Sequence, residues 1–360
     1  MSAARRVARL LLLLVLLATA VAGYFFYRLR HPGPASASEE VTVFIPPGTP
    51  TSSIFRRLAG SGVIRDARLA EIYYRLHRSA TRLQAGEYRF TRPMPIDEVI
   101  NRMGRGDVVK HTIVVPEGLA AAETFELFWK QGIGGPEGFQ AALREAELLP
   151  GITSGVSDLE GYLFPETYVV TRSTSARQIV DRMVEEFRKN FTPEMRQRAQ
   201  ALGLTPHQAV TLASIVEKET ALAQEGPVIA SVYLNRLRRG MRLQADPTIV
   251  YSMKRDRSWK GTLFRSDYAY ESPYNTYLHS GLPPGPICNP GRRALAAAVL
   301  PARTDYLYFV ADNMGGHTFS RTFEEHRMAI AAARQDRGVG EKTPPLPEEL
   351  PPSPDVPPGN

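Results

Sequence analysis

The hydrophobic pattern begins with an apolar run over residues 10–27, preceded by Arg5, Arg6 and Arg9 and followed by Arg28 and Arg30. A helix of this length spans roughly 27 Å, which is close to the thickness of a bilayer's hydrocarbon core. The run therefore predicts a single membrane span within residues 1–30. Arginines ahead of a span favour a cytoplasmic N-terminus, so everything after residue 30 is expected on the far side of the membrane.

A cleaved signal peptide is the alternative to an anchor, because two small-residue triplets near the end of the run, 18–20 and 20–22, resemble cleavage sites. In both cases the body is exported. Residues 31–40 are small, polar and proline-bearing, as expected of a linker between membrane and fold. Residues 342–360 are dominated by proline and acidic residues, which predicts a disordered tail.

Between the linker and the tail, the pattern alternates between strand-like and helix-like periods. In residues 41–155, a strand, a Pro/Gly turn and a helix occur twice, beginning at Val41 and at His111, with another strand between them over residues 83–90. This small α+β module carries no acid, thiol or metal cluster, so binding or spacing is its expected role.

Residues 156–341 read as mainly helical. Thr205, Pro206 and Gln208 form a capping-box pattern that predicts the start of a central helix. Further on, residues 306–310 and 318–320 read as two strands joined by a turn, and Thr322 opens a last helix. The predicted fold class is α+β with helices dominant, consisting of the anchor, the module and a helical domain with a short β-hairpin.

Composition narrows the range of functions. Cys288 is the only cysteine, so an exported chain would have no internal disulfide. The net charge of +7 is modest and spread along the chain, which gives no support to nucleic-acid binding. The seven histidines form no metal-binding motif and no phosphate-binding glycine loop is present, so we expect neither metal nor cofactor.

Two carboxylates, Glu217 and Glu219, fall within the apolar central helix. Burial raises the pKa of a carboxyl group and can turn it into a proton donor near neutral pH. At 100° per residue the two side chains diverge by about 200°, so they cannot both face one cleft. Glu219 falls on the more apolar side, whereas Glu217 shares its side with small residues; spacing alone leaves the choice open.

Six ordered motifs carry a family resemblance, and they read L-E-G-Y-L-F-P-E-T-Y at 159–168, A-S-I-V-E-K-E-T at 213–220, M-R-L-Q-A-D-P-T at 241–248, S-P-Y-N-T-Y at 272–277, G-L-P-P-G-P-I at 281–287 and G-G-H-T-F-S at 315–320. Together they resemble the endolytic murein transglycosylases of the YceG-like (MltG) family. The resemblance covers about residues 41 to 335. One departure is Glu166, where the family has aspartate, and another is Cys288 in the loop after P-P-G.

The resemblance implies a membrane-anchored lytic transglycosylase that cuts nascent peptidoglycan between N-acetylmuramic acid and N-acetylglucosamine and leaves 1,6-anhydro ends. It implies Glu217 as the catalytic acid and a LysM-like, glycan-associated module in the N-terminal part. It also implies the bacterial inner membrane as location, with the catalytic domain on the periplasmic side and wall synthases as partners. The competing hypotheses are a non-catalytic glycan-binding scaffold and a hydrolytic muramidase.

Other candidates are weaker. Gln244 and Asp246 are expected to bind substrate or to hold the acid, or alternatively to form the turn before the next helix. Tyr274 and Asn275 suit sugar stacking and hydroxyl recognition, although tyrosines in a long loop often only pack it. For three further residues a structural role is the expected one, although each was considered for the site: Glu160, Glu166 and His317.

Overall fold

The computed structural model describes residues 3–30, 39–76, 82–145, 149 and 156–336. The predicted linker, apart from Glu39 and Glu40, and the predicted tail lie outside these residues. Contacts between Cα atoms group the chain into two compact units, one of residues 1–112 and 169–174, the other of 113–168 and 175–360.

Helix α1 (Ala3–Arg30) contains a segment, Val7–Arg28, that is long and apolar enough to cross a membrane. It is the one such helix among the described residues, and none of its most apolar stretch is buried. Length and composition are thus consistent with the expected anchor. A signal sequence would have the same properties.

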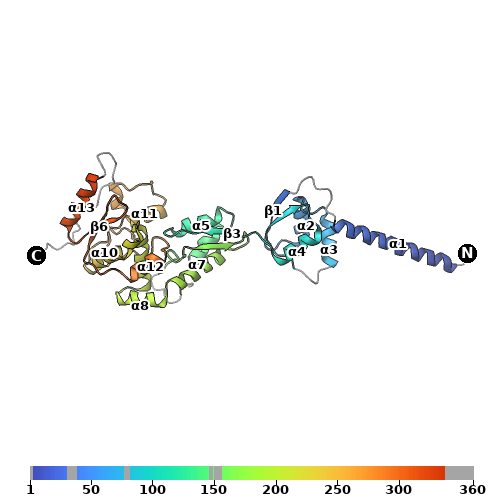
Figure 1. Ribbon diagram of the computed structural model, residues 1–360, viewed down its shortest axis with the longest axis horizontal. Coiled ribbons are helices and arrows are strands. Elements are labelled where there is room, and N and C mark those ends of the chain that lie inside the picture. Colours follow the sequence, from blue (N-terminus) through green and yellow to red (C-terminus); the bar gives the residue numbers. More distant parts are fainter. Residues whose placement is uncertain (1–2, 31–38, 77–81, 146–148, 150–155, 337–360) are drawn as a thin grey trace. The chain divides into compact units, whose positions relative to one another are not determined.

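The first unit has a two-stranded antiparallel sheet of β1 (Glu39–Ile45) and β2 (Gly86–Arg92), with Val43 opposite Tyr88. Helices α2 (Thr51–Gly60), α3 (Ala67–Leu76) and α4 (Ile96–Arg105) complete it (Figure 1). Alternate strand residues and one face of each helix meet in a single core, so the unit has its own hydrophobic interior. The predicted order of strand, turn and helix is confirmed here.

The short strands β3 (His111–Val114) and β4 (Thr167–Val170) form a second two-stranded sheet, and both lie where the chain crosses from one unit to the other. The sequence places a domain change at residue 155, whereas the compact units divide after Thr112. The reason is that residues 113–143 pack within the second unit, where β3 is followed by α5 (Ala121–Trp129) and α6 (Pro136–Leu143).

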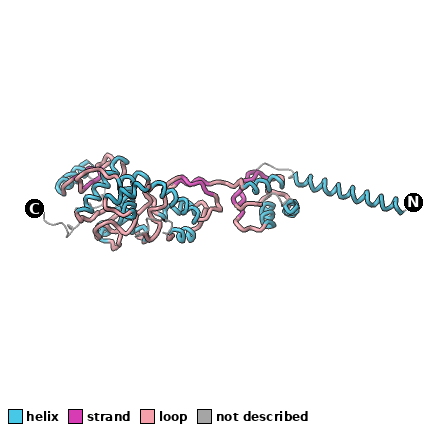
Figure 2. The backbone as a smooth tube through the Cα atoms, turned by 90° about the horizontal axis from the view of Figure 1, so that it is seen from below, coloured by secondary structure: helices cyan, strands magenta, loops and turns pink. Residues whose placement is uncertain are grey.

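The second unit is mainly helical, and Figure 2 shows helices and loops with few strands in it. Its central helix is α9 (Pro206–Glu219), which packs against α8 (Pro193–Ala201), α10 (Gly226–Arg238), α11 (Asp246–Arg255) and α12 (Arg292–Val299). Residues 209–216 of α9 are all buried, as expected of a helix that is covered on every side. Helix α7 (Ala176–Asn190) packs against α6.

The predicted hairpin is confirmed as β5 (Tyr308–Ala311) and β6 (His317–Ser320), which pair in antiparallel register with Ala311 opposite His317. The last helix, α13 (Phe323–Asp336), packs on both strands. Thr322 caps it as expected, because its hydroxyl accepts a hydrogen bond from the Glu325 N–H at 3.1 Å. Two short 3₁₀ turns, η2 (Ala223–Glu225) and η3 (Arg265–Ala269), complete the unit.

Candidate active site

Helix α9 delivers two glutamates to its C-terminal turn. The helix starts at the predicted capping box, in which the Thr205 hydroxyl accepts from the Gln208 N–H at 3.1 Å and the Gln208 side chain accepts from the Thr205 N–H at 2.9 Å. Its buried face also fixes the loop that precedes α12, because the Ser214 hydroxyl accepts from the Ile287 N–H at 3.0 Å. The helix is therefore fixed at its start and again at Ser214, one turn before the two glutamates.

Glu217 faces the start of α12. Its Oε2 accepts a hydrogen bond from the N–H of Gly291, the N-cap residue of α12, at 2.9 Å. The positive end of a helix dipole stabilises a carboxylate in this position. Burial raises the pKa of Glu217, and nearby Glu117 raises it further, whereas the Gly291 hydrogen bond and the charges of Lys218 and Arg293 oppose the rise.

Gly291 lies between the carboxyl groups of Glu117 and Glu217. A Cβ atom at this position would collide with the end of the Glu117 side chain, so any larger residue here would displace that side chain. Glu117 belongs to the turn after β3, and Lys218 donates to the Gly118 carbonyl of the same turn at 3.2 Å. Glu217 thus joins α9 to the start of α12, and the neighbouring Lys218 joins α9 to the turn after β3.

Glu219 faces the opposite way and lines a cavity of about 300 Å³. Ala221, two residues further along the chain, also lines the cavity. The other lining residues come from the β5–β6 hairpin: Ala311, Asp312, Asn313, Gly315, Gly316 and His317. The Tyr233 hydroxyl donates to Glu219 Oε1 at 3.0 Å. A carboxyl group at the wall of a cavity can reach a ligand.

The surroundings of Glu219 favour its protonated form. Burial raises the pKa of its carboxyl group to about 7, and the negative charge of Asp246 contributes in the same direction. The Tyr233 hydrogen bond and the positive charge of Arg236 oppose the rise. Near neutral pH this carboxyl group is therefore divided between its two protonation states, as a general acid requires.

Asp246 is held by two tyrosines. Its Oδ1 accepts from the Tyr277 hydroxyl at 2.6 Å and its Oδ2 accepts from the Tyr268 hydroxyl at 3.3 Å. Burial raises the pKa of Asp246, and both hydrogen bonds counteract this. With both oxygens occupied, Asp246 acts on Glu219 through its charge. Asp246 is also the first residue of α11, as the turn-forming interpretation predicted.

Arg236 anchors the hairpin side of the site. Its Nε donates to the Leu307 carbonyl at 2.6 Å and its Nη1 donates to the Leu243 carbonyl at 2.8 Å. The guanidinium therefore connects α10 to the strand that enters the hairpin and to the loop that carries Gln244. Burial lowers the pKa of Arg236.

The other predicted substrate-binding residues lie elsewhere. Gln244 has a left-handed backbone (φ 50°) and its N–H donates to the Thr276 carbonyl at 3.2 Å. Tyr274 packs against the Tyr251 ring, with 5.0 Å between the ring centroids, and beneath the Arg255 guanidinium. None of these side chains is part of the lining of the Glu219 cavity.

Asn275 is fully buried, and its amide holds a loop together. Its Nδ2 donates to the carbonyls of Tyr268 and Tyr270 at 3.0 and 2.9 Å, and its Oδ1 accepts from the Tyr277 N–H at 2.9 Å. Both tyrosines that contact Asp246 are thereby fixed. The structure brings Asp246 to Glu219 and places Asn275 behind it as a support.

Glu160 is a further buried carboxyl group. Its Oε1 accepts from the Ala121 N–H at the start of α5 at 2.9 Å, and its Oε2 accepts from the Tyr251 hydroxyl at 3.3 Å. Burial raises its pKa to about 8. Glu166 is exposed, and its carboxylate accepts from the Thr167 N–H at 2.9 Å. Both arrangements fit the expected structural roles.

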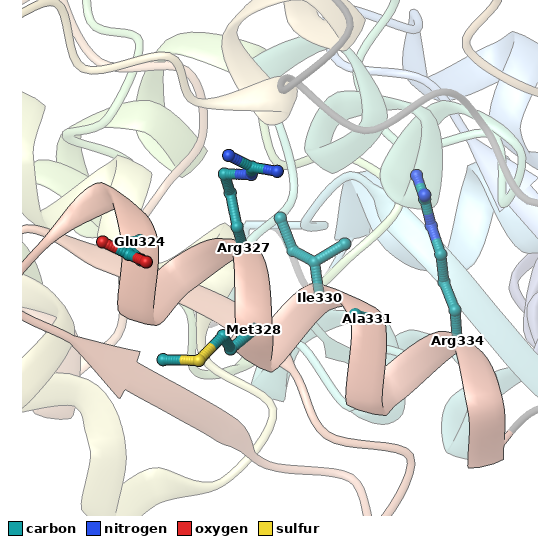
Figure 3. A pocket seen from close by; sticks show the side chains of 6 residues that line it. All are labelled: Glu324, Arg327, Met328, Ile330, Ala331 and Arg334. Carbon is teal, nitrogen blue, oxygen red and sulfur yellow. The ribbon is translucent and has the colours of Figure 1, made fainter.

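A second hollow, of about 350 Å³, runs along α13 and is lined by Glu324, Arg327, Met328, Ile330, Ala331 and Arg334 (Figure 3). Arg327, Ile330 and Arg334 point to the same side of the helix in this view. All six residues come from one helix, and the hollow contains no buried acid, so it is a poor candidate for proton-transfer chemistry. Within the described residues, no three histidines, cysteines or acids converge as metal ligands would.

Sequence reasoning missed several residues of the site. Tyr233 and Arg236 lie on α10, where their positions read as ordinary helix residues. Glu117 lies in the turn after β3, 100 residues before Glu217, which it approaches in space. The strand patterns at 306–310 and 318–320 and the G-G-H-T-F-S motif both indicated the hairpin, and the structure places its His317 in the cavity lining.

Comparison with known proteins defines the class to which this fold and site belong. The model of the YceG-like family matches residues 43–332. The chain is 33% identical to a Bacillus subtilis (strain 168) protein named endolytic murein transglycosylase, over 86% of this chain and 89% of the relative. An identically named protein of Streptococcus pneumoniae (strain D39) is 29% identical over 86% of this chain and 62% of its own length.

A solved structure supports the same assignment. The crystal structure of a yceG-like protein from Listeria monocytogenes superimposes with a TM-score of 0.52 at 33% identity, and covers 81% of this chain and 98% of that chain. The chain belongs to the YceG-like family.

Proposed function

We propose that this protein is an endolytic peptidoglycan lytic transglycosylase anchored in the membrane by α1. It would cleave the β-1,4 bond between N-acetylmuramic acid and N-acetylglucosamine in nascent glycan strands, leave 1,6-anhydro ends, and so terminate strand elongation. The proposal rests on the family and on the names of the relatives. The observation that carries it is a carboxyl group with a pKa of about 7 at the wall of a cavity.

We propose Glu219 as the catalytic acid, in place of the Glu217 that the family resemblance implied. Glu219 lines the cavity and has the higher tendency to hold a proton near neutral pH, whereas the Glu217 carboxylate is engaged at the N-terminus of α12. Glu217 remains the competing assignment. Because both positions are glutamate, the same substitution can be made at each, and a difference in activity then reports on their surroundings.

The first chemical step is proton donation. Protonated Glu219 donates to the glycosidic oxygen as the bond from that oxygen to C1 of the muramic acid breaks, so the N-acetylglucosamine leaves with a 4-hydroxyl and an oxocarbenium-like state develops on the muramic acid ring. The Tyr233 hydroxyl orients the acid by its hydrogen bond to Oε1. The charge of Asp246 keeps the proton on Glu219 before the reaction, and it favours the positive ring during the reaction.

The second step returns the proton. The Glu219 carboxylate takes the proton from the muramic acid 6-hydroxyl, whose oxygen then bonds to C1 and closes the 1,6-anhydro ring. One carboxyl group serves both steps, and no second carboxylate is needed as a nucleophile, in contrast to retaining glycoside hydrolases. No water enters the balance. The reaction is therefore that of a lyase.

We further propose the bacterial inner membrane as the location, with the second unit on the periplasmic side and wall synthases as partners. The arginines ahead of the apolar run in α1 support this orientation. For the first unit we propose a LysM-like, glycan-associated role, which its separate hydrophobic core supports. Anchoring then limits cleavage to strands close to the membrane.

The test is the mass of the products. The full-length chain, purified in detergent, is incubated with un-crosslinked peptidoglycan strands, and the fragments are analysed by mass spectrometry. The proposal predicts anhydro-ended fragments. Fragments heavier by one water identify a hydrolytic muramidase, and binding to the strands without any cleavage identifies the glycan-binding scaffold; either result overturns the proposed reaction.

A further inference from the structure

The hairpin turn that lines the Glu219 cavity is joined to α13 by Asn313, whose Nδ2 donates to the Ala333 carbonyl at 2.7 Å, and to the segment before α10 by the side chain of Glu225. Its Oε1 accepts from the His317 N–H at 2.9 Å, and its Oε2 lies 2.7 Å from His317 Nδ1. Both side chains are largely buried, with 14% of the Glu225 and 11% of the His317 side chain exposed. A buried charge-assisted pair of this kind holds its partners more firmly than a surface ion pair.

The turn fits closely against Glu225. A Cβ atom at Gly316 would lie 2.8 Å from Glu225 Oε1 and 3.1 Å from Leu222 Cδ1, so the approach depends on glycine at this position. Inside the turn, the Asp312 carboxylate accepts from the N–H groups of Met314 and Gly316 at 3.0 and 2.8 Å. The Asp312 hydrogen bonds hold the turn in one conformation, and Glu225 attaches the turn to the segment before α10.

The same attachment leads to the proposed acid through a series of direct contacts. The His317 ring packs edge-on against Phe309, with 5.2 Å between centroids, and Phe309 packs edge-on against Tyr233 at 5.8 Å. Tyr233 donates to Glu219. Phe319 packs against both His317 and Phe309, with 6.2 and 6.1 Å between centroids, so these side chains form one packed cluster through which a shift of His317 would be passed to the Tyr233 hydroxyl.

We propose that Glu225 is a positioning residue for the reaction. By holding His317, it sets the cavity wall formed by the hairpin turn and keeps Tyr233 in place to orient Glu219. The inference rests on the proposed function, because it concerns the same cavity. Glu225 is outside the cavity lining, so it acts on the reacting groups through His317 and Tyr233. A displacement of about 1 Å in such a geometry can cost on the order of 10²-fold in rate.

The test compares three variants of the full-length chain. Glu225→Ala removes both acceptors, and Glu225→Gln keeps a side-chain oxygen to accept from the His317 N–H. Glu123→Ala is the matched control, since Glu123 also accepts from one backbone N–H (Ala120, 3.0 Å) and one side-chain nitrogen (Lys254, 2.7 Å) in the same unit, away from the cavity. We measure kcat and KM for anhydro-product formation, thermal unfolding, and hydrogen exchange of the β5–β6 amides.

Glu225→Ala should lower kcat by about 10- to 100-fold with a smaller change in KM, and speed amide exchange in the hairpin. Glu225→Gln should restore most of kcat, and Glu123→Ala should keep kcat within about twofold. If Glu225→Ala keeps wild-type kcat while its hairpin amides exchange faster, the attachment is merely structural and the inference fails. A wild-type chain that yields no anhydro product overturns the proposed function, whereas the exchange data still report on the attachment.

Discussion

The two faces of the last turn of α9 carry the same side chain in opposite settings. On one face, Glu217 accepts from the N–H that starts α12 and lies near two cations. On the other, Glu219 lines a cavity beside Asp246 and has a pKa of about 7. The comparison teaches that burial alone does not identify a catalytic acid. Each acid has a second carboxylate beside it, Glu117 for Glu217 and Asp246 for Glu219, so the difference is that Glu217 accepts from a helix end whereas Glu219 lines an opening, where it is prepared for proton transfer.

The largest difference between the two faces is expected when each glutamate is shortened by one methylene group. Glu219→Asp withdraws the acid from the cavity, so we expect kcat to fall on the order of 10²-fold. Glu217→Asp should leave kcat within severalfold. Steady-state rates of anhydro-product formation measure both; equal losses would mean that the two faces do not differ in function.

The pH profile tests the protonation state of Glu219. An acid with a pKa of about 7 is fully protonated well below pH 7 and loses its proton as the pH rises. We therefore expect kcat to fall about tenfold for each pH unit above 7. The measurement is kcat between pH 5 and 9. A rate that stays constant across this range would contradict the proposed role, and Glu217→Gln should leave the profile unchanged.

Tyr233→Phe tests the hydrogen bond on the cavity face. This bond lowers the pKa of Glu219, so its removal should shift the alkaline limb of the pH profile upward. The loss of orientation should reduce kcat by about threefold to tenfold, a typical worth for one hydrogen bond. Both numbers come from one pH–rate series. A downward shift of the limb would show that Tyr233 does not stabilise the carboxylate.

The smallest effect is expected on stability at the other face. Glu217→Ala removes the side-chain acceptor at the start of α12, and loss of such a cap costs about 1 kcal/mol in the free energy of unfolding. Glu217→Gln keeps an acceptor and should cost less. Chemical denaturation of the second unit measures the difference. Unchanged stability of Glu217→Ala would remove the structural explanation for this residue.

Local patterns were enough to predict most elements of the fold. The capping box at Thr205, the hairpin and the cap at Thr322 depend on neighbouring residues, and the structure has all three. The place where the compact units divide could not be predicted, because it depends on residues 113–143 packing against distant helices.

The site was predictable only in part. The sequence narrowed the acid to Glu217 or Glu219, since both lie in a buried helix. Choosing between them required knowing that Gly291 and the hairpin turn approach opposite faces of α9, which are contacts across some seventy and ninety residues. Asn275 drew attention as a polar residue in a family motif, but its amide is used to hold a loop.

The most direct measurement is the rate of anhydro-product formation by Glu219→Gln and Glu217→Gln, purified and assayed side by side. Each change replaces a carboxyl group by an amide of the same shape. The account predicts that Glu219→Gln falls by at least about 10²- to 10⁴-fold, the typical worth of a general acid, and that Glu217→Gln stays within about tenfold of wild type. A Glu219→Gln variant that retains activity, beside a Glu217→Gln variant that loses it, would contradict the account.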